Sequence, residues 1–151
     1  MGQSLSAQLL DNAALAQARV RDAMTAPLPT LPAATPLAEA VEQLRAASGG
    51  IHIVVDDRGR LQGLCSAEVL AEALAAGGRP QAPLSGISLT PADVIAESRP
   101  LPEAVRVLLH AGVRQLVVVA DDDPARPVGI LTPLDVVLQR TWARDRGAAV
   151  S

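Results

Sequence analysis

Apolar side chains recur along this chain with a helical period in some stretches and form short continuous runs in others. Residues 37–44 place apolar side chains at i, i+3, i+4 and i+7, which is the stripe of a helix that faces a core. Residues 51–55 instead form a β-branched run, with glycine before it and aspartate after it, which is typical of a buried strand. The pattern therefore predicts a chain in which helices and strands alternate.

The same arrangement occurs twice, about 64 residues apart. Residues 36–57 match residues 100–121 in apolar pattern and in several identities. The register then shifts by two because the second turn is longer, so that residues 63–66 match residues 129–132. The chain therefore contains two copies of one structural unit.

Each copy is expected to form a strand, a helix, two strands and a closing helix. The second buried strand is predicted at 115–120, and return strands are predicted at 60–65 and 127–131, after tight turns. Ser66 and Thr132 stand where the closing helices begin, and a hydroxyl there accepts hydrogen bonds from the first free N–H groups. Both residues are predicted helix N-caps.

These elements give the domain organisation and a mixed α/β fold class. Glycine and proline break both periodic patterns between the copies, which indicates a linker. The predicted segments are an N-terminal helical extension (1–19), a first repeat (20–76), the linker (77–83), a second repeat (84–144) and a tail (145–151).

Composition narrows the function classes. Of the 151 residues 49% are hydrophobic but only 1% aromatic, so the core is aliphatic and the rings on which single-stranded nucleic acid stacks are missing. The net charge is -3, so nucleic acid is not an expected partner. All 13 basic residues are arginine, which excludes a P-loop lysine and a Schiff-base lysine. No apolar run reaches the ~20 residues that a membrane helix needs, so no membrane partner is expected.

Candidate catalytic chemistry is sparse. His52 and His110 lack further ligands at metal-binding spacing, and we see no nucleophile–base pair, so neither an enzyme nor a metal site nor a resident cofactor is expected. The single cysteine, Cys65, fits a reducing compartment, which favours the cytoplasm. Rich alanine and arginine content suggests a bacterial source.

The order and spacing of the motifs resemble a known family. VRDAMT at 20–25, LAEA at 37–40, IVVD at 53–56 and GLCS at 63–66 look like a cystathionine β-synthase (CBS) domain, and the second copy, closing with GILTPLD at 129–135, looks like another. The resemblance covers residues 20 to about 141. The opening hexapeptide is not kept in the second copy, where LSGISL replaces it at 84–89.

That resemblance implies a fold and a function. The fold is two βαββα repeats packed sheet to sheet as a pseudo-twofold module, with clefts between them that take AMP, ADP, ATP or S-adenosylmethionine. Such modules form homodimers and regulate an effector. No effector domain is recognised in this chain, so the regulated partner is expected to act in trans. The alternative function is a ligand-independent dimerisation or scaffold module.

Thr132 and Asp135 are the first candidate site residues. A helix N-terminus offers free N–H groups to an anion, and a carboxylate three residues on can accept both hydroxyls of a ribose. The resemblance likewise assigns Asp135 to the ribose and Thr132 to the region of the phosphates. The same spacing is also a capping box, worth ~1 kcal/mol whether or not a ligand binds. Both interpretations remain open at this point.

The other candidate residues follow from the resemblance alone. It implies that Gly129 and Ile130 flank the nucleoside and that Arg114 reaches phosphate. The residues implied to close over the base, from the first copy, are Met24 or Thr25, Thr30, Gly50 and Ile51.

The two copies differ at the decisive position. The first copy keeps the cap at Ser66 but has Val69 where the second has Asp135. An aliphatic side chain cannot bind a diol, and Glu68 points about 100° around the helix. One competent cleft and one degenerate cleft are therefore predicted.

Overall fold

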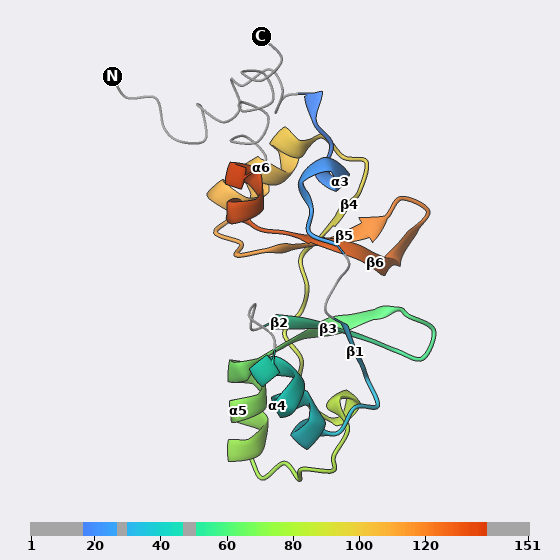
Figure 1. The fold of residues 1–151 in the computed structure, drawn as a ribbon, viewed down its shortest axis with the longest axis vertical. Coiled ribbons are helices and arrows are strands. Elements are labelled where there is room, and N and C mark those ends of the chain that lie inside the picture. The colour runs from blue at the N-terminus through green and yellow to red at the C-terminus, as the bar shows by residue number, and fades with distance from the viewer. Residues whose placement is uncertain (1–16, 27–29, 47–50, 139–151) are drawn as a thin grey trace, which may run out of the picture. The chain divides into compact units, whose positions relative to one another are not determined.

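The protein is described by a computed structural model that covers residues 17–26, 30–46 and 51–138. The chain forms two compact units (Figure 1). Unit 1 comprises Met1–Pro27, Asp93–Pro124 and Val128–Ser151, and unit 2 comprises Leu28–Ala92 and Ala125–Pro127. The predicted extension lies outside the described residues except at 17–19, and so do the predicted tail and Gly50.

Unit 2 contains a three-stranded sheet in the order β1-β2-β3. β1 (Thr30–Pro32) pairs parallel with β2 (Ile51–Val55), which pairs antiparallel with β3 (Leu61–Ser66). β2 has the predicted bounds and β3 is shifted by one residue. Both strands are set by the local pattern, since each is a short apolar run closed by turn residues.

Two helices and a short 3₁₀ helix complete unit 2: α4 (Leu37–Ala46), α5 (Ala67–Ala75) and η1 (Leu84–Gly86). Their apolar faces enclose an aliphatic core, as the composition predicts. Its buried members are Leu31, Leu37, Ala40, Val54, Cys65, Leu70 and Leu84.

The predicted linker helps to hold α4 in place. The Leu37 N–H donates to the Ala82 carbonyl at 2.9 Å, and the Ala38 N–H donates to the Pro80 carbonyl at 3.0 Å. The first N–H groups of a helix have no partner within it, so these carbonyls do what a capping side chain does elsewhere.

Unit 1 also contains a three-stranded sheet, in the order β4-β5-β6. β4 (Val94–Ala96) pairs parallel with β5 (Leu116–Ala120), next to which lies β6 (Asp123–Leu131). β6 begins four residues before the predicted start at 127. The turn uses only the two residues between β5 and β6. Pro124 can lie in β6 because β6 is an edge strand, where a missing N–H donor costs no hydrogen bond within the sheet.

The helices of unit 1 are α3 (Val20–Ala23), α6 (Leu101–His110) and helical residues 133–138. They pack on a second aliphatic core, whose buried members are Val20, Leu101, Ala104, Val105, Leu108, Leu116, Val118, Leu131 and Val136. No helix in the described part of the chain is both long and apolar enough to cross a membrane.

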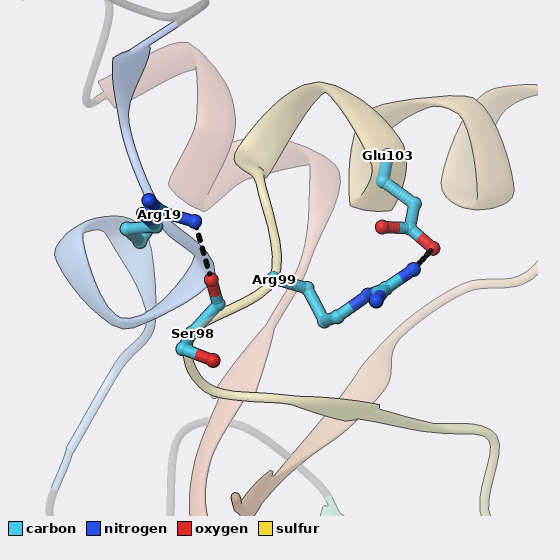
Figure 2. Close-up of polar contacts among 4 residues, drawn as sticks. All are labelled: Arg19, Ser98, Arg99 and Glu103. Carbon is cyan, nitrogen blue, oxygen red and sulfur yellow. Dashed lines mark hydrogen bonds and ion pairs between the residues drawn. The ribbon is translucent and has the colours of Figure 1, made fainter.

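The opening segment of the first repeat belongs to unit 1. The Val20 N–H donates to the Arg99 carbonyl at 2.9 Å, and the Val20 side chain is fully buried there. The Arg19 guanidinium donates to the Ser98 carbonyl at 3.0 Å, beside the Arg99–Glu103 ion pair at 2.6 Å (Figure 2). These contacts fix the segment that leads to Thr25.

The opening segment of the second repeat belongs, in the same way, to unit 2. The Leu84 N–H donates to the Thr35 carbonyl and the Ser85 N–H to the Ala33 carbonyl, each at 2.9 Å. Leu84 is fully buried in that core. The two repeats therefore exchange their opening segments, and the compact units divide the chain differently from the sequence repeats.

Candidate functional site

Thr132 and Asp135 form a reciprocal capping box at the start of helical residues 133–138. One carboxylate oxygen of Asp135, Oδ2, accepts from the Thr132 N–H at 2.8 Å and from the Thr132 hydroxyl at 3.1 Å. The Asp135 N–H donates in return to Thr132 Oγ1 at 3.3 Å. The predicted N-cap is confirmed, and this structural role of the pair is present without any ligand.

The second carboxylate oxygen of Asp135 is held from the opening segment. Asp135 Oδ1 accepts from the Thr25 hydroxyl at 2.8 Å. Two backbone hydrogen bonds anchor Thr25 on β6. The Thr25 N–H donates to the Ile130 carbonyl at 2.8 Å, and the Ile130 N–H donates to the Thr25 carbonyl at 3.1 Å. The Thr25–Asp135 bond is exposed, whereas the bonds from Thr132 are partly buried. A ligand arriving from solvent therefore meets Oδ1 and Thr25 first.

Gly129 on β6 allows the opening segment to approach closely. A Cβ at this position would lie 2.9 Å from Met24 Cγ and closer still to the Met24 sulfur. Glycine removes that collision and lets Met24 pack on the unit 1 core. The residue assigned to the nucleoside thus has a packing function as well.

A carboxylate oxygen that faces solvent gives this site its chemistry. An ionised carboxylate has about four lone-pair positions, all acceptors, so Asp135 suits hydroxyl groups and other donors. Arg114 belongs to the same unit, in the exposed segment before β5, and has no ion pair among the described residues. Unit 1 thus offers an acceptor group and an exposed guanidinium.

Unit 2 contains the same backbone arrangement without the carboxylate. Thr90 and Leu64 exchange backbone hydrogen bonds of 2.8 and 3.1 Å, as Thr25 and Ile130 do. Ser66 caps α5 by accepting from the Val69 N–H at 3.3 Å, which confirms the predicted N-cap. Val69 itself is buried, with 7% of its surface exposed.

The predicted site residues are distributed over both units. Thr30, at the start of β1, and Ile51, at the start of β2, belong to unit 2. Gly50 lies outside the described residues. The residues that unit 1 brings together are Thr25, Gly129, Ile130, Thr132 and Asp135.

The hydrogen bond between Thr25 and Asp135 is not among the contacts expected from the sequence. The resemblance implied instead that Thr25, from the first copy, closes over the base. The two residues are 110 positions apart, so no local spacing could have paired them. The only signal in the sequence for a shared role is a threonine near the start of each repeat: Thr25 lies five residues after residue 20, and Thr90 lies six residues after residue 84.

The remaining titratable core residues are the pair formed by His52 and Cys65, directly opposite each other on β2 and β3. Burial lowers the pKa of His52 and raises the pKa of the Cys65 thiol. His52 Nδ1 has no hydrogen-bond partner. Within the described ranges no three histidine, cysteine or acidic side chains gather closely enough to hold a metal ion.

Comparison with known proteins identifies the repeats. Residues 20–76 and 84–139 each match the family model for the CBS domain. AcuB from Vibrio cholerae has a similar fold, with a TM-score of 0.74, 24% identity, and coverage of 87% of this chain and 96% of that one. No curated protein sequence matches the chain.

Two further similar structures contain ligands. CBSX2 in complex with AMP has a TM-score of 0.69 and 26% identity, over 83% of this chain and 98% of that one. The CBS domain pair of protein MJ0100, in complex with 5′-methylthioadenosine and S-adenosyl-L-methionine, has a TM-score of 0.63 and 23% identity, over 85% and 98% of the two chains.

Proposed function

The chain belongs to the CBS domain family as a tandem pair, and from this we propose that it is a sensor of an adenosine-containing ligand. CBS-domain pairs are regulatory ligand-binding modules rather than catalytic ones. The ligand proposed here is AMP, ADP, ATP or S-adenosylmethionine, and the regulated protein is a separate chain.

One observation carries this proposal: the exposed oxygen of Asp135 in unit 1. The ligands of CBSX2 and of the MJ0100 pair share an adenosine group with a ribose diol. A carboxylate can accept hydrogen bonds from both hydroxyls of such a diol. Asp135 is the residue of this chain that supplies such an acceptor at a CBS helix start, because Val69 occupies the equivalent position in unit 2.

Arg114 distinguishes between the candidate ligands. An exposed guanidinium in the same unit suits a phosphate, since it donates several hydrogen bonds in a planar fork. We assign Arg114 to the phosphate group of the ligand. An arginine in this role favours AMP, ADP or ATP over S-adenosylmethionine.

Calorimetric titration of the full chain with AMP, ADP, ATP and S-adenosylmethionine tests the proposal. Asp135→Ala removes the acceptor and should weaken binding about 10- to 150-fold, because hydrogen bonds to a charged group are worth about 1.5–3 kcal/mol. Glu68→Ala, at an exposed acid in the first turn of α5, is the matched control and should bind as the wild type does. Unchanged affinity in Asp135→Ala would refute the assigned site.

A homodimer in the bacterial cytoplasm completes the proposal. Cys65 is an unpaired buried thiol, which suits a reducing compartment. An apolar groove of about 370 Å³ runs between α4 and α5 and offers a surface for a second copy. Its apolar lining residues are Val41, Leu44, Ala67, Leu70, Ala71 and Leu74.

The same groove supports the second candidate function, a dimerisation or scaffold module that needs no ligand. Leu74→Glu places a charge in the groove, where Leu74 is 43% exposed, and should convert a dimer to a monomer in light scattering. Glu72→Ala, outside the groove, is the control. A dimer that captures its partner equally well with and without nucleotide would favour the scaffold over the sensor.

A further inference from the structure

We propose that the Thr25 hydroxyl is an internal competitor for Asp135, which a cis-diol must displace to place both of its hydroxyls on the carboxylate. This inference rests on the proposed function, because it concerns how a ribose reaches that site. It makes Thr25 a residue that sets affinity through Asp135, and it removes Thr25 from contact with the base.

The count of hydrogen bonds on Asp135 leads to this proposal. Oδ2 accepts two donors from Thr132, and Oδ1 accepts one from Thr25. Three of about four lone-pair positions are thereby occupied by groups in the described part of the chain. A single ligand hydroxyl can use the remaining position. A diol needs two positions, so one of the three donors has to leave.

Thr25 is the donor that leaves at the lowest cost. The Thr132 N–H is fixed by the helix start, and the Thr132 hydroxyl also accepts from the Asp135 N–H, so its departure would break the cap. The Thr25 hydroxyl makes one exposed bond and can rotate about χ1 into water. Its backbone stays in place, because the two hydrogen bonds to Ile130 do not involve the side chain.

The geometry therefore gives Thr25 an effect opposite to that of a simple ligand contact. Removing a contact residue weakens binding, whereas removing a competitor strengthens it. Thr25→Val keeps the shape and β-branching of the side chain but cannot donate to Oδ1. Its affinity for AMP should rise about 2- to 12-fold, the range that one net hydrogen bond supplies.

Thr90 in unit 2 is the matched control. It exchanges the same backbone hydrogen bonds with Leu64 that Thr25 exchanges with Ile130, but the helix start in unit 2 has Val69 in place of the carboxylate. Thr90→Val removes an equivalent hydroxyl from an equivalent backbone position and should leave AMP affinity unchanged.

The experiment is calorimetric titration of the full chain with AMP and with 2′-deoxy-AMP. Thr25→Val should bind AMP more tightly than the wild type but should bind 2′-deoxy-AMP with unchanged affinity, because one hydroxyl needs only the position that is already open. Thr25→Ser restores the donor and should return AMP binding toward the wild-type value. Thr25→Ala, with a smaller side chain at this exposed position, should behave like Thr25→Val and serves if the valine variant does not fold.

The possible results separate the two proposals. If the wild type binds AMP and Asp135→Ala does not, but neither Thr25→Val nor Thr25→Ala binds more tightly, the competitor is refuted and the sensor stands. An equal gain for AMP and 2′-deoxy-AMP also refutes it, because the diol would then be irrelevant. If neither the wild type nor the Thr25 variants bind AMP, ADP, ATP or S-adenosylmethionine, the proposed function fails and the competitor fails with it.

Discussion

Unit 1 and unit 2 share one backbone plan but differ in the side chains that could act on a ligand. In each unit a parallel strand pair, an antiparallel return strand and a capped helix follow one another, and an opening segment from the other repeat bonds to the return strand. Only unit 1 has a carboxylate three residues after the helix cap, where unit 2 has Val69. The fold thus does not require the acid, since Val69 supports the same helix start from a buried position.

The largest expected difference in stability between the two units concerns one glycine on each return strand, Gly63 on β3 and Gly129 on β6. A Cβ at Gly63 would lie 2.8 Å from Leu89 Cβ and 3.1 Å from the Thr90 carbonyl oxygen, and neither atom can rotate away. At Gly129 the two nearest atoms, the Met24 sulfur and Met24 Cγ, belong to the flexible part of that side chain, and only Met24 Cβ, at 3.1 Å, is fixed. Gly63→Ala should therefore reduce the free energy of unfolding by about 3 kcal/mol and Gly129→Ala by about 1 kcal/mol.

Urea denaturation measures both values. Gly86→Ala is the control, because a Cβ there meets no atom within 4 Å, and it should change stability little. Equal losses of stability for Gly63→Ala and Gly129→Ala would contradict this difference, because they would show that the two opening segments are held equally rigidly.

The next expected difference is in the pH dependence of stability, and it comes from His52, a titratable residue in the core of unit 2. Leu116 on β5 occupies the position in unit 1 that His52 occupies on β2 in unit 2. The next residue on each strand, Val117 or Ile53, pairs with the first residue of the parallel strand, Val94 or Thr30. Burial holds the pKa of His52 below its ordinary value of 6.5. Between the two pKa values the unfolded chain binds a proton that the folded chain does not, so stability falls as the pH is lowered from 6.5.

His52→Leu copies unit 1 and should remove that pH dependence. It should also raise the free energy of unfolding by about 1 kcal/mol at pH 5, because His52 Nδ1 is buried without a partner. Denaturation between pH 5 and pH 8 measures the slope, with His110→Leu, at an exposed position on α6, as the control. A slope that survives in His52→Leu would assign the pH dependence to another group.

The comparison also shows how far sequence alone could reach. β2 and both helix caps were predictable because each depends on residues within one turn or one strand. The early start of β6 was not predictable, since Asp123 and Pro124 continue the turn-like sequence of Asp121 and Asp122, and the pairing with β5 decides where the strand begins. The exchange of opening segments, and with it the Thr25–Asp135 bond, was also beyond reach, because it joins residues 110 positions apart.

The smallest expected effect compares the two helix caps. Ser66→Ala removes one acceptor, for the Val69 N–H at 3.3 Å, and should lower the free energy of unfolding by about 0.5 kcal/mol. Thr132→Ala removes the acceptor for the Asp135 N–H and also a donor to Asp135 Oδ2, so it should cost about 1–2 kcal/mol.

Urea denaturation also distinguishes these values, with Ser85→Ala at an exposed position of η1 as the control. Thr132→Ala has a second consequence that Ser66→Ala lacks. It frees a lone-pair position on Asp135 Oδ2, but at the cost of the cap that orients the carboxylate. A stability loss no larger than that of Ser66→Ala would mean that the bond from the Thr132 hydroxyl to Asp135 Oδ2 adds nothing to the cap, and that unit 1 gains no more from its cap than unit 2 gains from Ser66.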